Sequence, residues 1–437
     1  MDIRKENMPC VLVISHNAFS NHDSNGKTLN ALFYKWDSDK IAELYFYPEE
    51  PSSTVCNNYF RITDGDIIRA FKLGDKQCGQ KINSNKSVNQ YEINKDYNMM
   101  TAFRKRNLSF SSLLFILRDI LWGFKFWRTD ELKEWVREFK PDVIFLILAN
   151  KKFSLKIAYY ISELLNIPIV LFTSDDRYRI DSKRISPIYY LEKYLLRKTI
   201  LKVCRNCKHI ITVSEKMNEI YSSLFSIQTT TIFTPVSRSI ACVKSENNKP
   251  LIMRYVGNLW LGRWRTLEQL CLAIKEVNSR EIRIVFEIYS SEKNPKIIKR
   301  INLLPDCKFM GVVSGTLVPK LLEESDIVVH AEDFSPINAR YTELSLSTKI
   351  SDYLGAGKCI LAIGPENIAS MVHIKNAAKC VYKIENILPA VREIVNNKEL
   401  RSNLQEKALL LAEQDHDFEK NHNLILNILR VNNYEVD

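Results

Sequence analysis

Short apolar runs alternate with helix-like stretches along almost the whole chain, and this pattern limits the possible folds more than any other feature. In the first half, PDVIFLILA (141–149) precedes the helix-periodic segment 151–166, and IPIVLFTSDD (167–176) follows it. The apolar runs lack a polar face, which is typical of strands buried in a parallel sheet. Strands that alternate with helices build βαβ units, so we expect an α/β chain with parallel sheets.

The alternation starts again after the polar stretch KSENNKP (244–250). There, LIMRYVGNL (251–259) is typical of a strand and TLEQLCLAIKEVN (266–278) of a helix. A second round of the pattern after a polar linker indicates a second domain, and 437 residues suit two or three domains of ordinary size. The expected organisation is a Rossmann-like domain over 1–244, another over 245–412, and a C-terminal helix over 413–437 that packs back towards the first domain.

Charge and composition limit the partners and the location. Lys and Arg number 62 against 51 Asp and Glu, and the net charge of +11 favours an anionic partner. The first residues lack a signal peptide and no run of about 18 apolar residues is present, so we expect a cytoplasmic protein. Ten scattered Cys are expected to be reduced thiols, and no cluster has the spacing of a metal site. Residues 74–107 are polar and weakly periodic, which predicts an insertion or loop.

Two common phosphate-binding motifs are missing. The segment HDSNGKT (22–28) resembles the end of a phosphate loop, but position 21 is Asn where that motif requires Gly. No GxGxxG sequence follows the first expected strand. Neither ATPase chemistry nor a standard dinucleotide site is therefore favoured.

One segment of the second domain predicts a site for a diphosphate. Ser347, Thr348 and Lys349 precede a helix that we expect to begin near Ile350. N–H groups at a helix start, together with a lysine, favour the binding of phosphate oxygens. Asp352 is expected in the first turn, where its carboxylate would either accept hydrogen bonds from a ribose or simply complement the helix dipole.

A basic loop of the second domain is the other candidate for phosphate binding. Its strand ends at Gly257, and Arg263 and Arg265 precede a helix expected from Thr266. Parallel α/β sheets bind ligands at the carboxyl ends of their strands, and guanidinium groups match phosphate oxygens. The alternative is a pair of solvated loop arginines.

Three segments carry a family resemblance. SNGKTLNALF (24–33), GNLWLGRWRTLEQL (257–270) and STKISDYLGAGKCILAIGP (347–365) together resemble retaining glycosyltransferases of the GT-B fold, family 4 type, and most of all bacterial surface-polysaccharide transferases. The resemblance implies two Rossmann-like domains that face a cleft. It also implies transfer of a sugar, with retention, from a nucleotide diphosphate sugar to a hydroxyl of a glycan or lipid-linked acceptor. No cofactor or obligatory metal is implied, because basic groups and helix dipoles carry the leaving diphosphate.

The resemblance also assigns roles to residues. Asp352 matches the position that binds the donor ribose, and FMGVV (309–313) matches the stretch whose backbone reads the nucleobase. The implied donor site comprises Gly257, Asn258, Arg263, Val312, Val313, Ser347, Thr348, Lys349 and Asp352. Arg263, Lys349 and Asp175 are expected to serve catalysis, and His16, Gly26, Lys27 and Asp176 are expected near the acceptor or the cleft.

Some positions depart from the pattern of the family. The carboxylate expected eight residues before Asp352 falls on Leu344, with Glu343 beside it. Asn258 replaces a common Arg, and Ser174 stands where a His is common. Two alternative functions therefore stay open, namely a GT-B nucleotide-sugar epimerase and a non-catalytic GT-B binding protein.

Two stretches of the first domain combine basic with aromatic residues. Residues 108–128 are largely apolar and include Trp122 and Trp127, and residues 177–208 carry ten Lys or Arg against two acidic residues. Such segments suit the surface of an anionic membrane, and the alternative is a core-packed helix with a solvated basic face. We expect a peripheral location on the inner face of the membrane. No motif for nucleic acid is present.

Overall fold

The computed structural model describes residues 8–20, 24–74, 77–82, 108–179, 186–236, 250–304 and 306–430. The chain divides into two compact units. The first comprises Met1–Thr212, Asn218–Thr231 and His422–Asp437, and the second comprises Val213–Met217 and Ile232–Asn421. The domain boundary that the sequence predicts near residue 245 lies outside the described residues.

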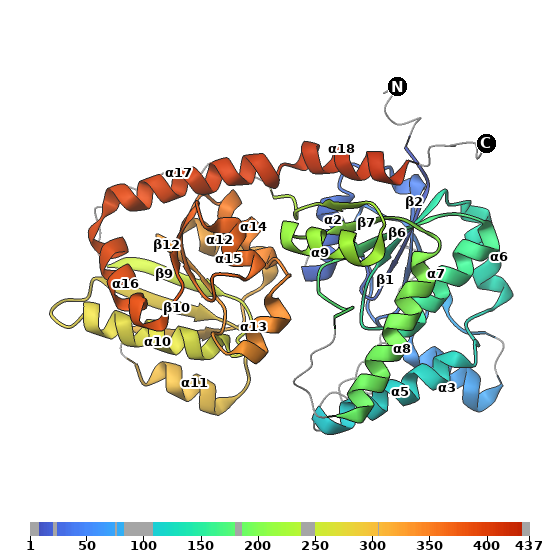
Figure 1. Ribbon diagram of the computed structural model, residues 1–437, viewed down its shortest axis with the longest axis horizontal. Helices are drawn as coiled ribbons and strands as arrows, with labels where there is room; N and C mark the ends of the chain where they lie inside the picture. The colour runs from blue at the N-terminus through green and yellow to red at the C-terminus, as the bar shows by residue number, and fades with distance from the viewer. Residues whose placement is uncertain are drawn as a thin grey trace. The chain divides into compact units, whose positions relative to one another are not determined.

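The described strands of the first unit form one sheet with the order β4-β3-β2-β1-β5-β6-β7-β8 (Figure 1). Neighbouring strands are parallel, except that β4 runs antiparallel to β3. Strands β1, β2 and β6 are buried at every position, as expected for apolar runs without a polar face. The strands are β1 (Val11–Ser15), β2 (Ile41–Tyr45), β3 (Asn58–Arg61), β4 (Gln80–Ile82), β5 (Val143–Ile147), β6 (Ile169–Thr173), β7 (Cys207–Thr212) and β8 (Thr229–Thr231).

Helices follow most of these strands, and their caps are local in sequence. Thr63 and Asp66 form a capping box at the start of α3, and the hydroxyl of Thr129 accepts a hydrogen bond from the Leu132 amide at the start of α6. The helices are α2 (Ser24–Leu32), α3 (Asp64–Leu73), α5 (Leu108–Gly123), α6 (Asp130–Phe139), α7 (Lys152–Leu165), α8 (Pro187–Cys204) and α9 (Glu215–Phe225).

The second unit contains, in its described part, a fully parallel sheet with the order β11-β10-β9-β12-β13-β14. This is the doubly wound order 3-2-1-4-5-6 of a Rossmann-like domain. The strands are β9 (Leu251–Val256), β10 (Ile284–Tyr289), β11 (Cys307–Gly311), β12 (Ile327–Ala331), β13 (Cys359–Ile363) and β14 (Ala378–Val381). The helices are α10 (Arg263–Val277), α11 (Pro295–Asn302), α12 (Val318–Glu323), α13 (Pro336–Thr342), α14 (Thr348–Gly355), α15 (Ala369–Ile374), α16 (Ile387–Asn396) and α17 (Lys398–Asp415).

The C-terminal part of the chain returns to the first unit, as the sequence predicts. Helix α18 (Phe418–Leu429) follows α17 after a break, so the helix expected over 413–437 is not continuous. His422 of α18 lies edge-on to the rings of Tyr34 and Trp36, at 6.0 Å between centroids in each case. Lys208 donates a hydrogen bond to the carbonyl of Arg430 at 3.0 Å.

Two local predictions were wrong. Helix α10 begins at Arg263 and not near Thr266, because Gly262 adopts a left-handed conformation (φ 78°) that turns the chain directly into the helix. Helix α14 begins at Thr348 with Ser347 as its cap, so Asp352 lies in the second turn and not in the first. The insertion or loop that the sequence predicts over 74–107 stays a prediction, because strand β4 lies within it and residues 75–76 and 83–107 lie outside the described residues.

Candidate functional site

The switch point of the second sheet brings two loops together. Strands β9 and β12 are neighbours, and the chain leaves β9 towards β10 on one side and β12 towards β13 on the other. The loops that follow the carboxyl ends of two such strands enclose the crevice in which open α/β sheets bind their ligands. Here these loops are 257–262 after β9 and 332–335 after β12.

Arg263, the first residue of α10, forms a buried, bidentate ion pair with Glu332 of the loop after β12. The guanidinium Nε lies 3.1 Å from Glu332 Oε2, and the second terminal nitrogen lies 2.9 Å from Oε1. The remaining terminal nitrogen donates to the side chain of Asn258 at 2.7 Å. An arginine carries five N–H groups, so two N–H groups of Arg263 are not used by these three bonds. The charge of Glu332 raises the pKa of Arg263 against the opposing effect of burial.

Lys349 approaches the same point from the first turn of α14. Its ammonium donates to the hydroxyl of Tyr255 at 3.2 Å and lies 4.5 Å from the centre of that ring. Burial and the charge of Arg263 lower the pKa of Lys349 to about 7, while Glu332 raises it. A lysine that titrates near neutral pH changes its charge readily when an anion approaches.

Gly257 leaves the space that Lys349 occupies. A Cβ atom at position 257 would lie 2.0 Å from the Lys349 ammonium and 2.7 Å from its Cε. Any side chain at position 257 would displace the end of Lys349, so this glycine serves close packing and not a special backbone angle. Gly257, Asn258, Arg263 and Lys349, which the sequence assigned to the donor site, therefore lie together in the structure.

The start of α14 offers backbone N–H groups beside Lys349. Ser347 caps the helix without a hydrogen bond from its own side chain to the first turn, and Thr348 is exposed. Uncapped N–H groups at a helix start attract anions. Asp352 lies one turn further along α14 and is half-buried, where complementing the helix dipole would be weaker than in the first turn.

Three residues near the site were not among the predicted site residues. Glu332 holds Arg263, Tyr255 covers Lys349, and His330 is buried on β12 with its Nε2 3.8 Å from Glu332 Oε1. Burial, Lys349 and Arg263 lower the pKa of His330 to about 3, and its Nε2 accepts or donates no hydrogen bond within the described residues. All three lie in or just after β9 or β12, the two strands of the switch point. Sequence reasoning could use this position only if it knew the order of the strands in the sheet.

Other residues assigned to the donor lie at the edge of this group. Val312 and Val313 follow β11, the edge strand two places from β9, and Val312 is exposed. The side chain of Arg265 is 56% exposed, stacks over Trp264 at 5.2 Å and lies 3.5 Å from Asp333. Arg263 is thus the arginine that is buried beside the loop after β12, whereas the side chain of Arg265 is largely exposed.

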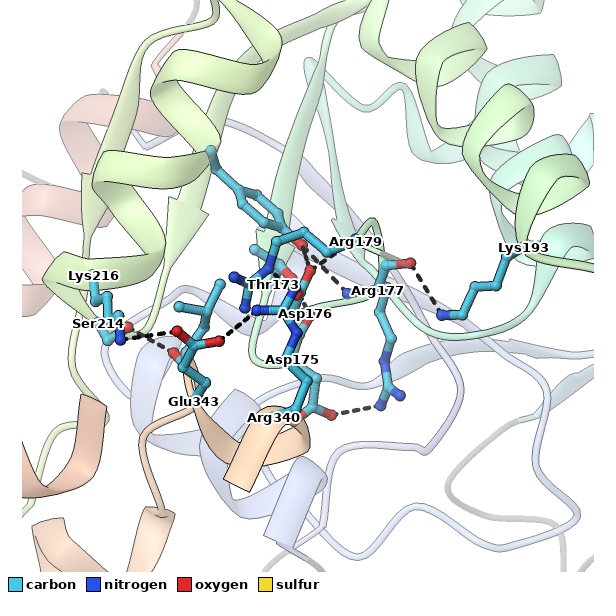
Figure 2. A network of polar contacts seen from close by, with 12 residues as sticks. Thr173, Asp175, Asp176, Arg177, Arg179, Lys193, Ser214, Lys216, Arg340 and Glu343 are labelled. Atoms are coloured by element: carbon cyan, nitrogen blue, oxygen red, sulfur yellow. Dashed lines mark hydrogen bonds and ion pairs between the residues drawn. The ribbon is translucent and has the colours of Figure 1, made fainter. Parts of the chain in front are cut away.

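The carboxylate that the family resemblance would place at position 344 is replaced by a leucine. Leu344 is buried, and its carbonyl accepts a hydrogen bond from Ser214 at 2.7 Å. Glu343 forms ion pairs with Lys216 at 3.0 Å and with Arg340 at 2.7 Å, as Figure 2 shows. The carboxylate of Glu343 is therefore held by two cations of its own unit.

In the first unit, Asp175 and Asp176 follow β6 as expected. Asp175 pairs with Arg177 at 2.5 Å, and Asp176 pairs with Arg179 and accepts a hydrogen bond from Tyr221 at 3.2 Å (Figure 2). These contacts fix the turn after β6, so both carboxylates have a structural role.

His16, Gly26 and Lys27 belong to the segment that follows β1. His16 lies edge-on to Tyr47 at 5.4 Å between centroids, and Lys27 is exposed. A Cβ at Gly26 would lie 2.6 Å from Ser20, so the glycine lets α2 pack against the preceding loop.

Two carboxyl groups that sequence reasoning missed hold this loop. Glu43 accepts a hydrogen bond from the Phe19 amide at 2.9 Å, and its other carboxyl oxygen lies 2.8 Å from the Ser15 hydroxyl, within hydrogen-bond distance. Glu49 accepts one from the Ala18 amide at 2.7 Å. Glu43 is completely buried, and burial raises its pKa to about 8.

Neither a metal site nor a membrane-spanning helix is seen in the part of the chain that the structure describes. There, no group of three or more His, Cys, Asp or Glu is placed to hold a metal ion. Likewise, no helix in the described ranges combines the length and the apolar character needed to cross a bilayer.

Comparison with known proteins identifies the fold. No protein-family model matches the chain, and no curated protein matches it in sequence. Among solved structures, HepE from Anabaena in complex with UDP has a TM-score of 0.60 at 12% identity, over 96% of this chain and 99% of that one. WaaG, a glycosyltransferase involved in lipopolysaccharide biosynthesis, has a TM-score of 0.56 at 10% identity, over 97% and 100%.

A UDP-forming trehalose-phosphate synthase from Burkholderia xenovorans, in complex with glucose-6-phosphate, is also similar. Its TM-score is 0.57 at 7% identity, over 96% of this chain and 100% of that one. The likeness extends over nearly the full length of every compared chain, through both Rossmann-like units. The chain therefore has the GT-B fold, as the sequence predicts.

Proposed function

We propose that the protein is a glycosyltransferase that moves a sugar from a nucleoside diphosphate sugar to a hydroxyl group. The observation that carries this proposal is the meeting of Arg263, Lys349 and the start of α14 at the switch point of the second unit. Together they offer two cations and backbone N–H groups to one anion. A diphosphate is the anion whose size and charge suit such a set.

The same groups would stabilise the transition state. As the glycosidic bond to the donor breaks, negative charge grows on the leaving diphosphate, and groups already aimed at that charge lower the barrier. Arg263 would use its two remaining N–H groups while Glu332 keeps it in place. Lys349 would take up a proton as the anion binds, because the anion raises its pKa from about 7.

The remaining donor contacts follow the resemblance found in the sequence. Asp352 would bind the ribose, and the backbone at Val312 and Val313 would meet the nucleobase. The UDP in the HepE structure and the UDP-forming activity in the name of the trehalose-phosphate synthase make uridine nucleotides the first donors to test. We further propose that transfer retains the anomeric configuration, as in family 4, and needs no metal.

The acceptor side belongs to the same proposal. The first unit would bind a glycan or a lipid-linked acceptor near His16, Gly26, Lys27, Asp175 and Asp176. A role in bacterial surface polysaccharide synthesis is supported by the resemblance of the sequence and by the lipopolysaccharide pathway named for WaaG. The enzyme would work in the cytoplasm, at the inner face of the membrane.

Product analysis tests the proposal. The full chain would be incubated with a panel of nucleotide sugars, with and without a lipid extract, and with EDTA in a parallel set. We expect release of a nucleoside diphosphate that depends on the extract and persists in EDTA. An epimerase would instead convert the donor without an acceptor, and a binding protein would bind a donor and release nothing, hydrolysis products included.

Asp352→Ala tests the ribose contact. Because the carboxylate would bind the ribose hydroxyls, calorimetry should show weaker binding of the donor found above, with little change in the melting temperature. Asp326, which caps the start of β9 through the Ile252 amide, is not a suitable control, since its removal would disturb the fold. Arg265→Ala is the control, because it also removes a charged side chain, but one that is 56% exposed and has no assigned contact with the ribose. Unchanged donor affinity in Asp352→Ala would remove the residue from the site.

A further inference from the structure

Helix α5 of the first unit exposes an apolar stripe. Leu117 and Ile120 lie three residues apart, Phe124 follows the helix end, and all three are about half exposed. The opposite side of α5 is fixed firmly to the unit. Arg118 pairs with Asp64 at 2.8 Å, and Trp122 is buried. The exposed stripe therefore belongs to a helix that is well packed.

Helix α5 is further anchored on its inner side. Asp119 pairs with Lys152 at 2.5 Å, and the ring of Trp122 stacks on Phe153 with 3.9 Å between centroids. Large apolar side chains on a rigid surface cannot retreat from water by rearranging, so they favour a partner that covers them.

The stripe continues onto α3 through three phenylalanine rings. Phe71 near the end of α3 lies 5.5 Å from Phe124 and 6.4 Å from Phe126, and the two latter rings are 6.0 Å apart. Leu73, at the end of the same helix, is 76% exposed. Segments distant in sequence thus build one apolar cluster. Lys72 and Lys125 stand exposed beside it.

Helix α8, which packs against α5 (Figure 1), carries a second stripe of exposed apolar side chains. Ile188, Leu191 and Leu195 recur at helical spacing and are exposed, and so is Lys198 one turn further on. Other bases of α8 are engaged inside the unit. Arg197 lies over the ring of Tyr178 and Lys202 over that of Tyr159, each at 4.4 Å.

We infer that this face, formed by the exposed side chains of α3, α5 and α8, docks on the surface of an anionic lipid bilayer. Exposed Leu, Ile and Phe would enter the boundary between headgroups and acyl chains, and the lysines among them would meet anionic headgroups. The net charge of +11 favours the same partner. Apolar insertion is the main contribution in this arrangement, because only part of the basic set on α8 faces outward.

A second copy of the chain is a poorer occupant of this face. In a two-fold contact the same patch meets itself, so Lys72, Lys125 and Lys198 of both copies would enter one interface. Like charges that lose water against each other are unfavourable, whereas anionic headgroups compensate them.

The inference rests on the proposed function only for the purpose of docking, which would place the enzyme beside a lipid-linked acceptor. Its test uses vesicles and no substrate, so it fails or succeeds independently of sugar transfer. The probe is sedimentation of the full chain with phosphatidylcholine vesicles that contain or lack 30% phosphatidylglycerol, at low and high salt. We expect binding to the anionic vesicles that persists in part at high salt.

The variant Ile120→Ser/Phe124→Ser/Leu191→Ser should bind these vesicles at least tenfold more weakly. The matched control is Ile282→Ser/Leu303→Ser, which removes exposed apolar side chains from the second unit and should bind as the wild type does. Lys72→Glu/Lys125→Glu should weaken binding to anionic vesicles and leave any binding to neutral vesicles unchanged, because it removes the attraction to anionic headgroups but not the apolar side chains. Melting temperature and UDP affinity should stay unchanged in all variants, which excludes unfolding as the cause.

Three results would overturn the inference. The first is wild-type protein that sediments with none of the vesicles, and the second is a Ser variant that sediments as the wild type does. A wild-type dimer that the Ser variant converts to a monomer, without any effect on vesicle binding, would assign the face to a second copy of the chain.

Discussion

The protonation state of Lys349 determines how strongly the candidate site attracts an anion. Its pKa is lowered to about 7 by burial and by Arg263, and only the charged form attracts a diphosphate. The affinity for UDP should therefore fall by up to about tenfold for each pH unit above 7, because the proton must be supplied on binding. Calorimetry between pH 6 and 9 measures this slope.

Lys349→Met should remove that pH dependence and weaken UDP binding by about 10–100-fold at pH 6.5, the size expected for a lost hydrogen bond to a charged group. The same variant should be more stable than the wild type at pH 6. The lysine is then charged and buried in the folded state, and this cost disappears as pH rises from 7 towards its unfolded pKa. Equal pH slopes for both proteins would contradict the role of Lys349.

Arg263 combines a structural and a functional role that a single substitution cannot separate. Arg263→Ala would leave Glu332 buried without its partner, which costs about 3–5 kcal/mol of stability. Arg263→Ala/Glu332→Gln should recover most of that stability in equilibrium denaturation. It should still reduce turnover at saturating donor by about 10²–10³-fold, the size of losing one such donor of hydrogen bonds.

Arg265→Ala is the control for this pair, because an exposed side chain should change stability by no more than about 0.5 kcal/mol. Turnover that survives in the double variant and fails in Arg265→Ala would show that the wrong arginine had been assigned to the diphosphate.

At the scale of elements, the loop after β1 depends on a buried acid. The Ser15 hydroxyl lies within reach of both Asn17 O and Glu43, and it has only one hydrogen to donate. A protonated Glu43, consistent with its pKa of about 8, can donate to Ser15 while Ser15 donates to Asn17. The carboxyl group then holds the loop as a neutral side chain.

Glu43→Gln should therefore preserve stability near pH 7, whereas Glu43→Ala should lose it. In the wild type the folded state retains this proton from the unfolded pKa near 4.5 up to about 8, so stability falls as pH rises through that interval. The Gln variant should lack this contribution and exceed the wild type above pH 8 in thermal melting. A Gln variant with an unchanged pH profile would mean that Glu43 is ionised at neutral pH.

At the scale of the whole molecule, the two units have similar architecture but carry different side chains at the ends of their strands. The described switch point of the second unit holds Arg263, Glu332 and Lys349, while the candidate side chains after β6 in the first unit fix a turn. UDP should therefore protect amides of residues 257–263 and 347–352 from hydrogen exchange. At about 100 times its dissociation constant it should add ~2.7 kcal/mol of apparent stability.

Exchange measured on the intact chain with and without UDP checks this expectation, and Lys349→Met serves as the control that should lose the protection. Protection confined to the first unit would assign nucleotide binding to the other half of the molecule.

The sequence by itself determined the class of fold, because the alternation of apolar runs and helices is a local pattern that survives without knowledge of contacts. It also predicted that Gly257, Arg263 and Lys349 belong to one candidate site. Glycine, arginine and lysine near strand ends and helix starts are residue types that favour an anion site whatever their distant contacts. The exact starts of α10 and α14 were missed, because they depend on the backbone angles of Gly262 and Ser347, which the sequence does not give directly.

Only the tertiary structure paired Arg263 with Glu332, which lies 69 residues away, because strands β9 and β12 become neighbours in the sheet. The same holds for Gly257, whose missing Cβ makes room for Lys349. Phe71 and Phe124 likewise meet only when α3 packs on α5. Contacts of this kind depend on strand order and helix packing, which arise from the burial of many side chains at once and not from the residues that finally touch.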